Sequence, residues 1–417
     1  MSAERLTPLL VGPCPAEWQQ PYIDEVTDLL TNGFVGPSLP HQTENHETGI
    51  RYLQGFNVRP NKLDLTRTTW VTHDFHSKNR KSQLREGDVL VVQSGHIGTA
   101  AVVPEEAAGS NCHAVIICRF KAGIVDPDFA SQYLNSQIGQ SRLRGLHVGS
   151  SLSHINTSEL GRFKLPLPPL REQRKLVELW GTWDTAIQKT EQLIAAKERH
   201  YSHELSHLTS RGQHPHAHVG TFTEEVSVRN RGGKWRTVPL SEIATVWKGQ
   251  QLNKDAMVED GAYYALNGGI KPSGRTTEWN CEADTITVSE GGNSCGFVSY
   301  NRERFWCGGH CYAVTKLAKD VDAHYLFHYL KGKQSRVMAL RVGSGLPNIQ
   351  KSAIEAFPVV LPDLATQTAI ARYLNALREE INLLGQSVSA LKTQKRGLMQ
   401  KLLTGQWRLP VAEASGA

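Results

Sequence analysis

Paired cysteine motifs are absent from the sequence. Seven cysteines, an odd number, occur in 417 residues, and no two of them have C-x-x-C spacing. A disulfide framework usually has an even number of cysteines, and structural zinc sites usually use C-x-x-C pairs, so free thiols are expected. The segment Cys307-Gly-Gly-His310-Cys311 holds three candidate metal ligands, but no second pair follows at zinc-finger spacing. The cysteines therefore predict neither a disulfide framework nor a structural metal site.

Long apolar stretches are also missing. The chain has no run of about 18 apolar residues, the length that a membrane-spanning helix needs. Its N-terminal segment MSAERLTPLLVGPCP lacks the basic start and apolar core of a secretory signal. Hydrophobic residues make up 39% of the chain and charged residues 21%, as in ordinary globular proteins. We therefore expect a cytoplasmic protein without membrane contact, long enough for two or three domains.

Catalytic signatures are scarce as well. The P-loop pattern G-x-x-x-x-G-K-[ST] does not occur, and neither do the Asn-Pro-Pro-aromatic and Asp-Pro-Pro-Tyr signatures of amino-methyltransferases. The net charge of +6 is a mild basic excess, compatible with a polyanionic partner but too small to identify one. The sequence thus predicts a binding protein that catalyses no reaction of its own.

What the sequence does contain is an internal repeat. The segment VGSSLSHINTSELGRFKLPLPPLREQRKLVELW (148–180) matches VGSGLPNIQKSAIEAFPVVLPDLATQTAIARYL (342–374) without gaps, with eleven identities in the first 26 positions and an offset of 194 residues. The copies also open alike, with WQQPYIDEV from Trp18 and WRTVPLSEI from Trp235 at an offset of 217, whereas their middles diverge. Self-similarity over such a length predicts two similar domains in tandem.

Each copy ends in a long predicted helix. Apolar residues recur there every seven positions, which is typical of helices that pair as a coiled coil. Lys395 is the one polar interruption. The pattern leaves open whether the two helices run parallel or antiparallel. The expected seam consists of Trp180, Ile187, Ile194, Tyr201 and Leu208 on the first helix and Leu374, Ile381, Leu384, Val388, Leu391, Leu398 and Leu402 on the second.

One segment of the first helix suggests catalysis. HELSH (203–207) matches H-E-x-x-H, in which two histidines bind zinc and the glutamate acts as general base. The second copy has Gly397-Leu398-Met399-Gln400-Lys401 at this place, and the third ligand of the extended motif would fall on Gln213. A zinc metalloprotease is therefore the weakest alternative. Incidental metal binding is a better explanation for the histidines of this region, His203, His207, His214, His216 and His218.

The repeat carries a more specific motif at the entry to each long helix. The run Leu-Pro-Pro-Leu-x-Glu-Gln (167–173) precedes the first helix, and the second copy keeps Gln367 but has Asp363 and Thr366 in place of Pro169 and Glu172. Together with the strand-and-turn segment EGDVLVVQSGHIGTAAVV (86–103) and the heptad helices, this motif resembles the DNA-specificity subunit of type I restriction–modification systems. The resemblance covers nearly the whole chain.

The resemblance implies a fold and a domain organisation. It implies an α/β (α+β) fold with two target-recognition domains in tandem pseudo-repeat, each followed by a long helix, and the two helices paired as a coiled coil. The implied boundaries are residues 1–165 and 235–359 for the recognition domains, 166–210 and 360–406 for the spacer helices, 211–234 for a linker and 407–417 for a C-terminal tail.

The resemblance also implies partners. Each recognition domain would read one half of a split double-stranded DNA sequence, while the helices would set the spacing and dock two methyltransferase subunits. No cofactor is expected in this chain: S-adenosylmethionine would bind to the methyltransferase, and ATP and Mg to the restriction subunits that can join. The alternative is a two-copy protein adaptor that binds no DNA, and DNA-dependent capture of a methyltransferase would distinguish the two.

Candidate DNA contacts lie in predicted turns and basic clusters of the two domains. Lysine and arginine bind phosphates, and arginine, asparagine and glutamine can read base edges. In the first domain the candidates are Lys78, Arg80, Lys81, Gln93, Ser94, His96, Arg142, Arg144, Ser150 and His154. In the second domain they are Asn267, Lys271, Arg275, Asn293, Ser294, Arg336, Arg341, Ser344 and Asn348.

Overall fold

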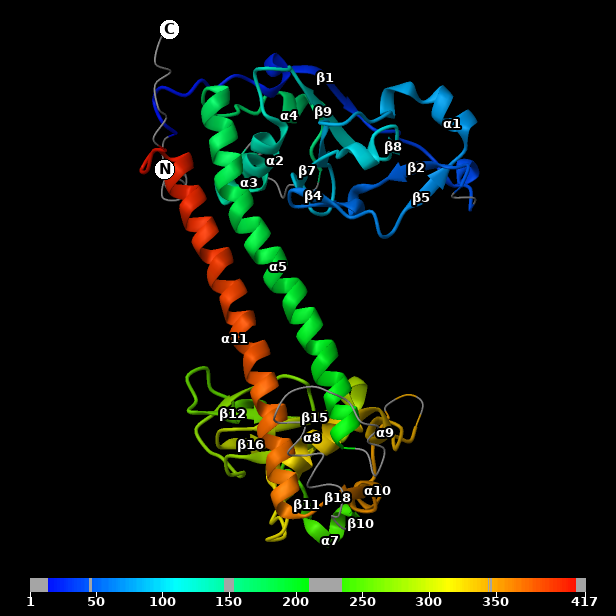
Figure 1. Ribbon diagram of the computed structural model, residues 1–417, viewed down its shortest axis with the longest axis vertical. Coiled ribbons are helices and arrows are strands. Elements are labelled where there is room, and N and C mark those ends of the chain that lie inside the picture. Colours follow the sequence, from blue (N-terminus) through cyan, green and yellow to red (C-terminus); the bar gives the residue numbers. More distant parts are fainter. Residues whose placement is uncertain are drawn as a thin grey trace. The chain divides into compact units, whose positions relative to one another are not determined.

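The computed structural model describes residues 14–44, 47–145, 154–209, 235–343, 345 and 347–409. The chain divides into two compact units: unit 1 comprises Met1–Lys189 with Val388–Ala417, and unit 2 comprises Thr190–Ser387. Unit 1 is therefore discontinuous in the sequence, whereas unit 2 is one continuous segment. Two long helices, α5 (Leu170–Leu208) and α11 (Leu364–Leu403), contribute residues to both units (Figure 1).

The core of unit 1 is a four-stranded antiparallel sheet in the order β1-β9-β6-β7. Every residue of its inner strand β6 (Val89–Val92) is buried, with Val89 and Val91 in one apolar cluster and Leu90 and Val92 in another. A strand covered on both faces needs a continuous apolar run rather than an alternating pattern, and the sequence has such a run here. The other strands are β1 (Thr27–Asn32), β9 (Val115–Phe120) and β7 (Ala100–Val102).

Smaller elements complete unit 1. Asp126 caps α2 by accepting hydrogen bonds from the N–H groups of Asp128 and Phe129, and Pro127 suits the first turn of the helix. The helices are α1 (His73–Lys78), α2 (Pro127–Asn135), α3 (Gln137–Arg144) and α4 (Thr157–Gly161). A second sheet has the order β5 (Thr69–Val71), β2 (Ile50–Leu53), β8 (Asn111–Cys112), and β3 (Val58–Arg59) pairs with β4 (Lys62–Leu63).

Unit 2 repeats this plan. Its main sheet has the order β11-β17-β14-β15 and is again antiparallel. Its second sheet has the order β13-β12-β16 and contains one parallel pair, β12 with β16, which corresponds to the parallel pair of β2 with β8 in unit 1. The strands are β11 (Thr245–Lys248), β12 (Tyr263–Leu266), β13 (Gly274–Thr276), β14 (Thr285–Ser289), β15 (Val298–Asn301), β16 (Phe305–Cys307) and β17 (Cys311–Thr315). The helices are α7 (Leu240–Ile243), α8 (Ala323–Gly332), α9 (Gln334–Met338) and α10 (Lys351–Glu355).

The backbone pairing reproduces both offsets of the sequence repeat. In unit 2, β10 (Arg236–Pro239) pairs with β18 (Pro358–Leu361), so that Arg236 lies opposite Leu361 and Pro239 opposite Pro358. In unit 1, Gln19 lies opposite Leu167 and Tyr22 opposite Lys164. The opening and closing segments of each copy are therefore neighbours in space, which explains why these two segments resemble one another between the copies while the middles diverge.

A buried glutamine explains the motif before each long helix. In unit 1 the Gln173 side chain accepts a hydrogen bond from the N–H of Asp126 (2.8 Å) and donates to the carbonyls of Ile124 (2.9 Å) and Pro168 (2.8 Å). Gln367 makes the same three kinds of contact in unit 2, to Asp322, Asp320 and Pro362. Because a buried amide must be fully hydrogen-bonded, this residue fixes the helix entry against the start of α2 or α8.

The two long helices pair in antiparallel fashion. In unit 1, Leu176 and Trp180 near the start of α5 share an apolar cluster with Met399 and Leu402 near the end of α11. In unit 2 the end of α5 shares a cluster with the start of α11, where Tyr201 and Leu208 join Leu374 (Figure 1). Of the predicted seam, Trp180, Ile187, Tyr201, Leu208, Leu374, Ile381, Val388 and Leu402 are buried, and Ile194, Leu384, Leu391 and Leu398 are half-buried.

The predicted α/β (α+β) tandem fold with paired long helices is therefore confirmed, whereas the predicted domain boundaries remain predictions. All seven cysteines are free thiols. Among the described residues, no helix combines the length and the apolar character needed to cross a membrane.

Candidate functional site

Three loops of unit 2 meet at Glu290, the residue that follows β14. The N–H of Glu290 donates to the carbonyl of His310 (2.9 Å), in the loop between β16 and β17. The carbonyl of Glu290 accepts from the N–H of Ile349 (2.9 Å), and the next residue, Gly291, forms a β-bridge with Asn348. The residues next to the repeated Val-Gly-Ser segment are thereby joined to the end of an inner strand.

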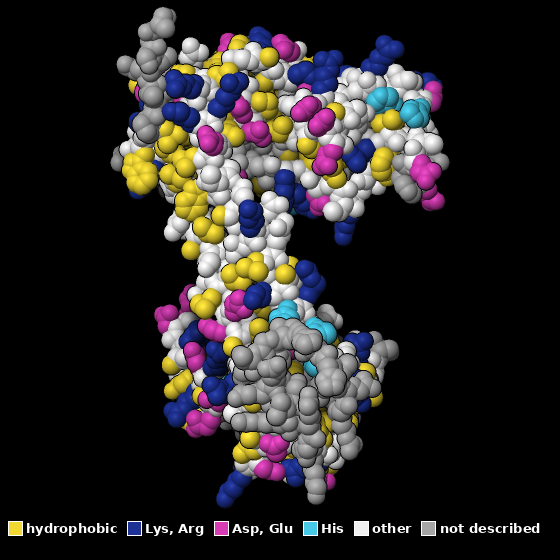
Figure 2. All heavy atoms as spheres, in the orientation of Figure 1, with side chains coloured by type: hydrophobic (Ala, Val, Ile, Leu, Met, Phe, Trp, Pro, Cys, Tyr) yellow, Lys and Arg dark blue, Asp and Glu magenta, His cyan; other side chains and the backbone are white. Residues whose placement is uncertain are grey.

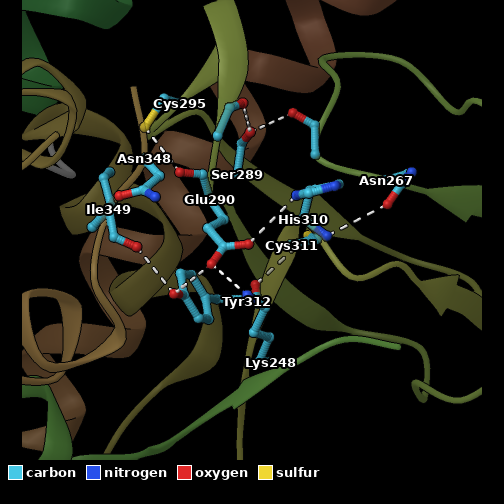
Figure 3. Close-up of polar contacts among 12 residues, drawn as sticks. Lys248, Asn267, Ser289, Glu290, Cys295, His310, Cys311, Tyr312, Asn348 and Ile349 are labelled. Carbon is cyan, nitrogen blue, oxygen red and sulfur yellow. Dashed lines mark hydrogen bonds and ion pairs between the residues drawn. The ribbon is translucent and has the colours of Figure 1, made fainter. Parts of the chain in front are cut away.

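The Glu290 carboxylate is the centre of this junction (Figure 3). It lies 2.6 Å from the ammonium of Lys248, accepts a hydrogen bond from the Tyr312 hydroxyl (3.1 Å) and lies 3.7 Å from Nδ1 of His310. Its side chain is only 12% exposed, whereas those of Lys248 and His310 are 51% and 64% exposed. Burial, and then the neighbouring carboxylate, raise the pKa of Tyr312, so its hydroxyl keeps its proton. A buried anion thus holds two exposed polar groups.

Unit 1 contains the corresponding junction without a carboxylate or an ammonium group among its described side chains. The carbonyl of Gln93, after β6, accepts from the N–H of Ile155 (3.0 Å), and Ser94 forms a β-bridge with His154. The Ser94 hydroxyl is also 2.8 Å from Nδ1 of His154. The Gln93 side chain is buried and donates to Oδ1 of Asn32 (3.0 Å), the last residue of β1. The two units therefore share a backbone arrangement but carry different chemistry on it.

Glycines shape both loops. Gly95 and Gly292 adopt φ values of 77° and 70°, a left-handed conformation that strongly favours glycine. Gly98 and Gly296 then return the chain, donating to the carbonyls of Val92 (2.9 Å) and Ser289 (2.8 Å). These two tight turns expose Ser94 and His96 in unit 1 and Asn293 in unit 2.

Several predicted DNA contacts are brought together at these junctions. In unit 1 they are Gln93, Ser94 and His154, and His96 lies on the same turn. In unit 2, Asn348 is bridged to the turn that contains Asn293 and Ser294. The Asn267 side chain accepts from the N–H of His310 (3.4 Å), and the Ser294 hydroxyl donates to the carbonyl of Gly268 (2.5 Å), so a further loop joins the cluster.

Other predicted contacts lie on different elements. Lys78 ends α1, where it pairs with Asp74 (2.8 Å), and the exposed Arg80 and Lys81 follow in the next turn. Lys271 is exposed in the loop before β13. On the face drawn in Figure 2, lysine and arginine lie among aspartate and glutamate, so basic charge does not single out a binding surface on that face. Exposed arginines are found at the end of α3, on α9 and after α9, namely Arg144, Arg336 and Arg341.

Two predicted arginines are engaged within their own unit. Arg142 donates to the hydroxyl of Tyr133 (2.8 Å) and lies over the ring of Phe163, 5.8 Å from its centroid. Arg275 donates to the carbonyls of Gly261 (2.5 Å) and Ala262 (3.0 Å). These contacts hold both guanidinium groups against their own unit, and the DNA contacts predicted for them remain predictions. The predicted contacts Ser150 and Ser344 lie outside the described residues.

Within the HELSH segment of α5, His203 is exposed and His207 half-buried, whereas Glu204 and Leu205 are buried. The rings of His203 and His207 stack with their centroids 6.1 Å apart, and the His203 side chain is 74% exposed. Among the residues that the structure describes, no group of three or more His, Cys, Asp or Glu side chains is arranged to hold a metal ion. His214, His216 and His218 fall outside the described residues. A stacked histidine pair on a helix surface forms no substrate cleft, so the geometry gives the protease alternative no support.

The turn of unit 2 also matches a hydrolase sequence pattern. Residues Gly292-Asn293-Ser294-Cys295-Gly296 have the form G-x-S-x-G, in which a strained strand-to-helix turn exposes a nucleophilic serine. Here the turn joins two antiparallel strands, β14 and β15, and the serine hydroxyl is used as a donor to a backbone carbonyl. The pattern therefore arises from turn geometry, without the arrangement of a nucleophile elbow.

Comparison with known families gives a consistent result. The model of a family described as type I restriction modification DNA specificity domain matches residues 17–198 and 232–393. A putative type I specificity subunit from Mycoplasma pneumoniae is 29% identical over 177 residues, which are 42% of this chain and 47% of that protein. A putative type I restriction enzyme MjaX specificity subunit from Methanocaldococcus jannaschii is 21% identical over 439 residues, which cover 96% of each chain.

The extent of these matches differs. The match to the Mycoplasma pneumoniae protein spans about half the length of that relative, and a match to a putative type I specificity subunit from Mycoplasma genitalium spans 40% of its length. Among solved structures, the S subunit of a type I restriction-modification system from M. genitalium has a TM-score of 0.60 at 19% identity, covering 93% of this chain and 96% of that one. At this identity the similarity establishes a common fold.

Proposed function

The chain belongs to the family of type I restriction–modification DNA specificity subunits, and from this premise we propose that each unit reads one half of a split double-stranded DNA sequence. The observation that carries the proposal is the junction after β6 and β14. One backbone hydrogen bond, from Ile155 or Ile349, and one β-bridge recur at this junction in both units, whereas the side chains differ. A common scaffold with different side chains is what two unrelated half-sequences require, because base edges are read by side-chain donors and acceptors.

The long helices are proposed to serve as the docking surface for two methyltransferase subunits. Leu193 on α5 and Leu383 on α11 are exposed and lie outside the predicted seam, so they offer apolar contacts to a protein partner. In this proposal S-adenosylmethionine binds to the methyltransferase, and ATP and Mg bind to restriction subunits that join the complex. This chain contributes recognition without catalysis, in the cytoplasm.

Mapping of methylated sites tests the proposal. The chain would be co-expressed with a methyltransferase subunit of its own system in a host that lacks other methylation, and the genome sequenced for modified bases. We expect one split sequence with a fixed gap between its halves. Methylation at a single continuous sequence would contradict two-unit reading. If the chain captured the methyltransferase but did not bind DNA, the result would support the adaptor alternative.

A further inference from the structure

The junctions of the two units contain a matched pair of side chains that differ in charge. The strand registers establish the equivalence: Asn32 lies opposite Ile116 where β1 pairs with β9, and Lys248 lies opposite Tyr312 where β11 pairs with β17. Each is the last residue of an outer strand. Each contacts the residue that follows the inner strand, Gln93 at 3.0 Å in unit 1 and Glu290 at 2.6 Å in unit 2.

The inner member of each pair is held firmly. Gln93 and Glu290 are buried, and the carbonyl of each accepts a hydrogen bond from an isoleucine of the repeated segment, Ile155 in unit 1 and Ile349 in unit 2. The Tyr312 hydroxyl, which donates to Glu290, lies 3.0 Å from the carbonyl of Ile349 (Figure 3). The side chains of Gln93 and Glu290 are therefore fixed in position, and each orients the outer side chain that it contacts. Of these outer side chains, Asn32 is half-buried and Lys248 is half-exposed.

The two outer side chains suit different bases. A lysine ammonium has three donors, and with one directed to Glu290 the others can bind the O6 and N7 acceptors of guanine. An asparagine amide has a donor and an acceptor that match N7 and N6 of adenine, and the Oδ1 atom that accepts from Gln93 keeps a second lone pair. A carboxylate close to DNA is unfavourable unless it is neutralised, and Lys248 neutralises Glu290.

We propose that Lys248, oriented by Glu290, contacts a guanine in the half-sequence read by unit 2, and that Asn32, oriented by Gln93, contacts an adenine in the half-sequence read by unit 1. Glu290 and Gln93 are positioning residues in this assignment. It rests on the proposed function, because it identifies residues through which each unit reads its half. The imidazole of His310, whose Nδ1 lies 3.7 Å from the Glu290 carboxylate, is 64% exposed and in this assignment contacts the backbone of the DNA.

Exchange of the pair is the decisive experiment. The double variant K248N/E290Q carries the unit 1 pair in unit 2 and leaves the net charge unchanged. The purified full chain, wild type or variant, would select sequences from a random duplex DNA library. We expect one position of the second half-sequence to change from guanine to adenine, with affinity for the original sequence reduced about tenfold or more. The first half-sequence should stay the same.

Three controls keep the result interpretable. The variant K197N/E380Q removes a Lys–Glu pair of the long helices in unit 2 (2.7 Å) and should leave both half-sequences unchanged. The reverse exchange N32K/Q93E should change one position of the first half-sequence only. The single variant E290Q keeps the lysine and should lower affinity without changing the preferred base, since the ammonium is then less firmly oriented.

The outcomes separate this inference from the proposed function. If the wild-type chain selects no split sequence, the proposed function fails. If it selects one but both exchange variants, with melting temperatures like the wild type, retain every base preference, the assignment of Lys248 and Asn32 is overturned. K248N/E290Q could instead keep the preferred base while the slope of log affinity against log salt concentration becomes shallower by about one. That result would make Lys248 a phosphate contact.

Discussion

The two units differ in the polar contacts that join a shorter helix to the long helix pair. In unit 1, Lys395 of α11 forms an ion pair with Asp184 of α5 (2.7 Å) and donates to the side chain of Gln132 on α2 (3.1 Å). In unit 2, the Tyr201 hydroxyl donates to Nδ1 of His328 on α8 (3.0 Å), and Nε2 of His328 donates to Asn375 (2.9 Å).

Lys395 and Tyr201 are separated by 194 residues, the offset of the repeat, so they occupy the same position on their helices. The lysine that interrupts the heptad pattern is therefore not a defect in the seam. Both units use this position to bind a polar side chain of the shorter helix: unit 1 through a hydrogen bond from the ion-paired Lys395 to Gln132, and unit 2 through a hydrogen bond to the neutral His328. A repeated fold can keep a contact in place while its chemistry changes.

The largest expected effect is a change in the gap between the two half-sequences, caused by insertions in the long helices. The insertion points are between Lys189 and Thr190 and between Ser387 and Val388, where the units divide. One heptad inserted at both places keeps the apolar stripe in register and adds roughly 10 Å of helix. Since B-DNA rises about 3.4 Å per base pair, we expect the gap between half-sequences to lengthen by about three base pairs. Both half-sequences should stay the same.

Methylome sequencing measures the gap. Two residues inserted at one place rotate the apolar stripe out of contact and should abolish assembly, as monitored by size-exclusion chromatography with the methyltransferase. An active heptad variant with an unchanged gap would mean that these helices do not set the spacing.

A smaller effect is expected from Lys395→Met, which breaks the polar contact of unit 1 alone. Asp184 and Gln132 lose their cationic partner in a partly buried place, and we expect a loss of about 1–2 kcal/mol in the free energy of unfolding. Urea denaturation measures it. The matched variant Tyr201→Phe removes one hydrogen bond from unit 2 and should cost about 1 kcal/mol. A Lys395→Met chain as stable as the wild type would show that the apolar stem alone maintains the contact.

An effect of similar size is expected from pH, through one buried histidine of unit 2. Burial lowers the pKa of His328 to about 4, and the nearby cationic Arg378 acts in the same direction. Because an unfolded histidine titrates near 6.5, the stabilising contribution is complete above about pH 6.5 and is lost as the pH falls towards 4. We expect a loss of about 2 kcal/mol between pH 7 and pH 5.

Hydrogen exchange resolves this prediction by region. Amides of α8 should lose protection at pH 5 relative to pH 7 after correction for intrinsic exchange rates, while those of α2, which carries Gln132 at the equivalent place, should not. The variant His328→Gln should remove the difference. Equal loss of protection in α2 and α8 would attribute the effect to the chain as a whole.

Much of the fold could be predicted because its signals are local or periodic. The Val-Gly-Ser repeat, the run before Gln173 and the heptad rows each lie within a short stretch of sequence, and the family assignment that they supported is confirmed by the family match. The direction of helix pairing could not be predicted, because an apolar stripe packs equally well against a stripe of either polarity.

The candidate site was less accessible to prediction. The turns after β6 and β14 were found through their glycines, but Asn32, Lys248 and His310 were missed. Lys248 and Glu290 are 42 positions apart, and only the pairing of β11 with β17 and of β17 with β14 brings them together. Arg142 and Arg275, two further predicted contacts, make hydrogen bonds within their own unit that the sequence alone does not reveal, and their predicted DNA contacts remain predictions.

The discontinuity of unit 1 has a consequence for synthesis on the ribosome. Unit 2 is complete once Ser387 has emerged, whereas the core around Trp180 still lacks Met399 and Leu402. At roughly 5–20 residues per second, the nascent first segment waits on the order of 10–40 seconds for these partners. The later-encoded unit can therefore finish folding first. Throughout that interval the apolar surface of the earlier segment is exposed to chaperones and to neighbouring nascent chains.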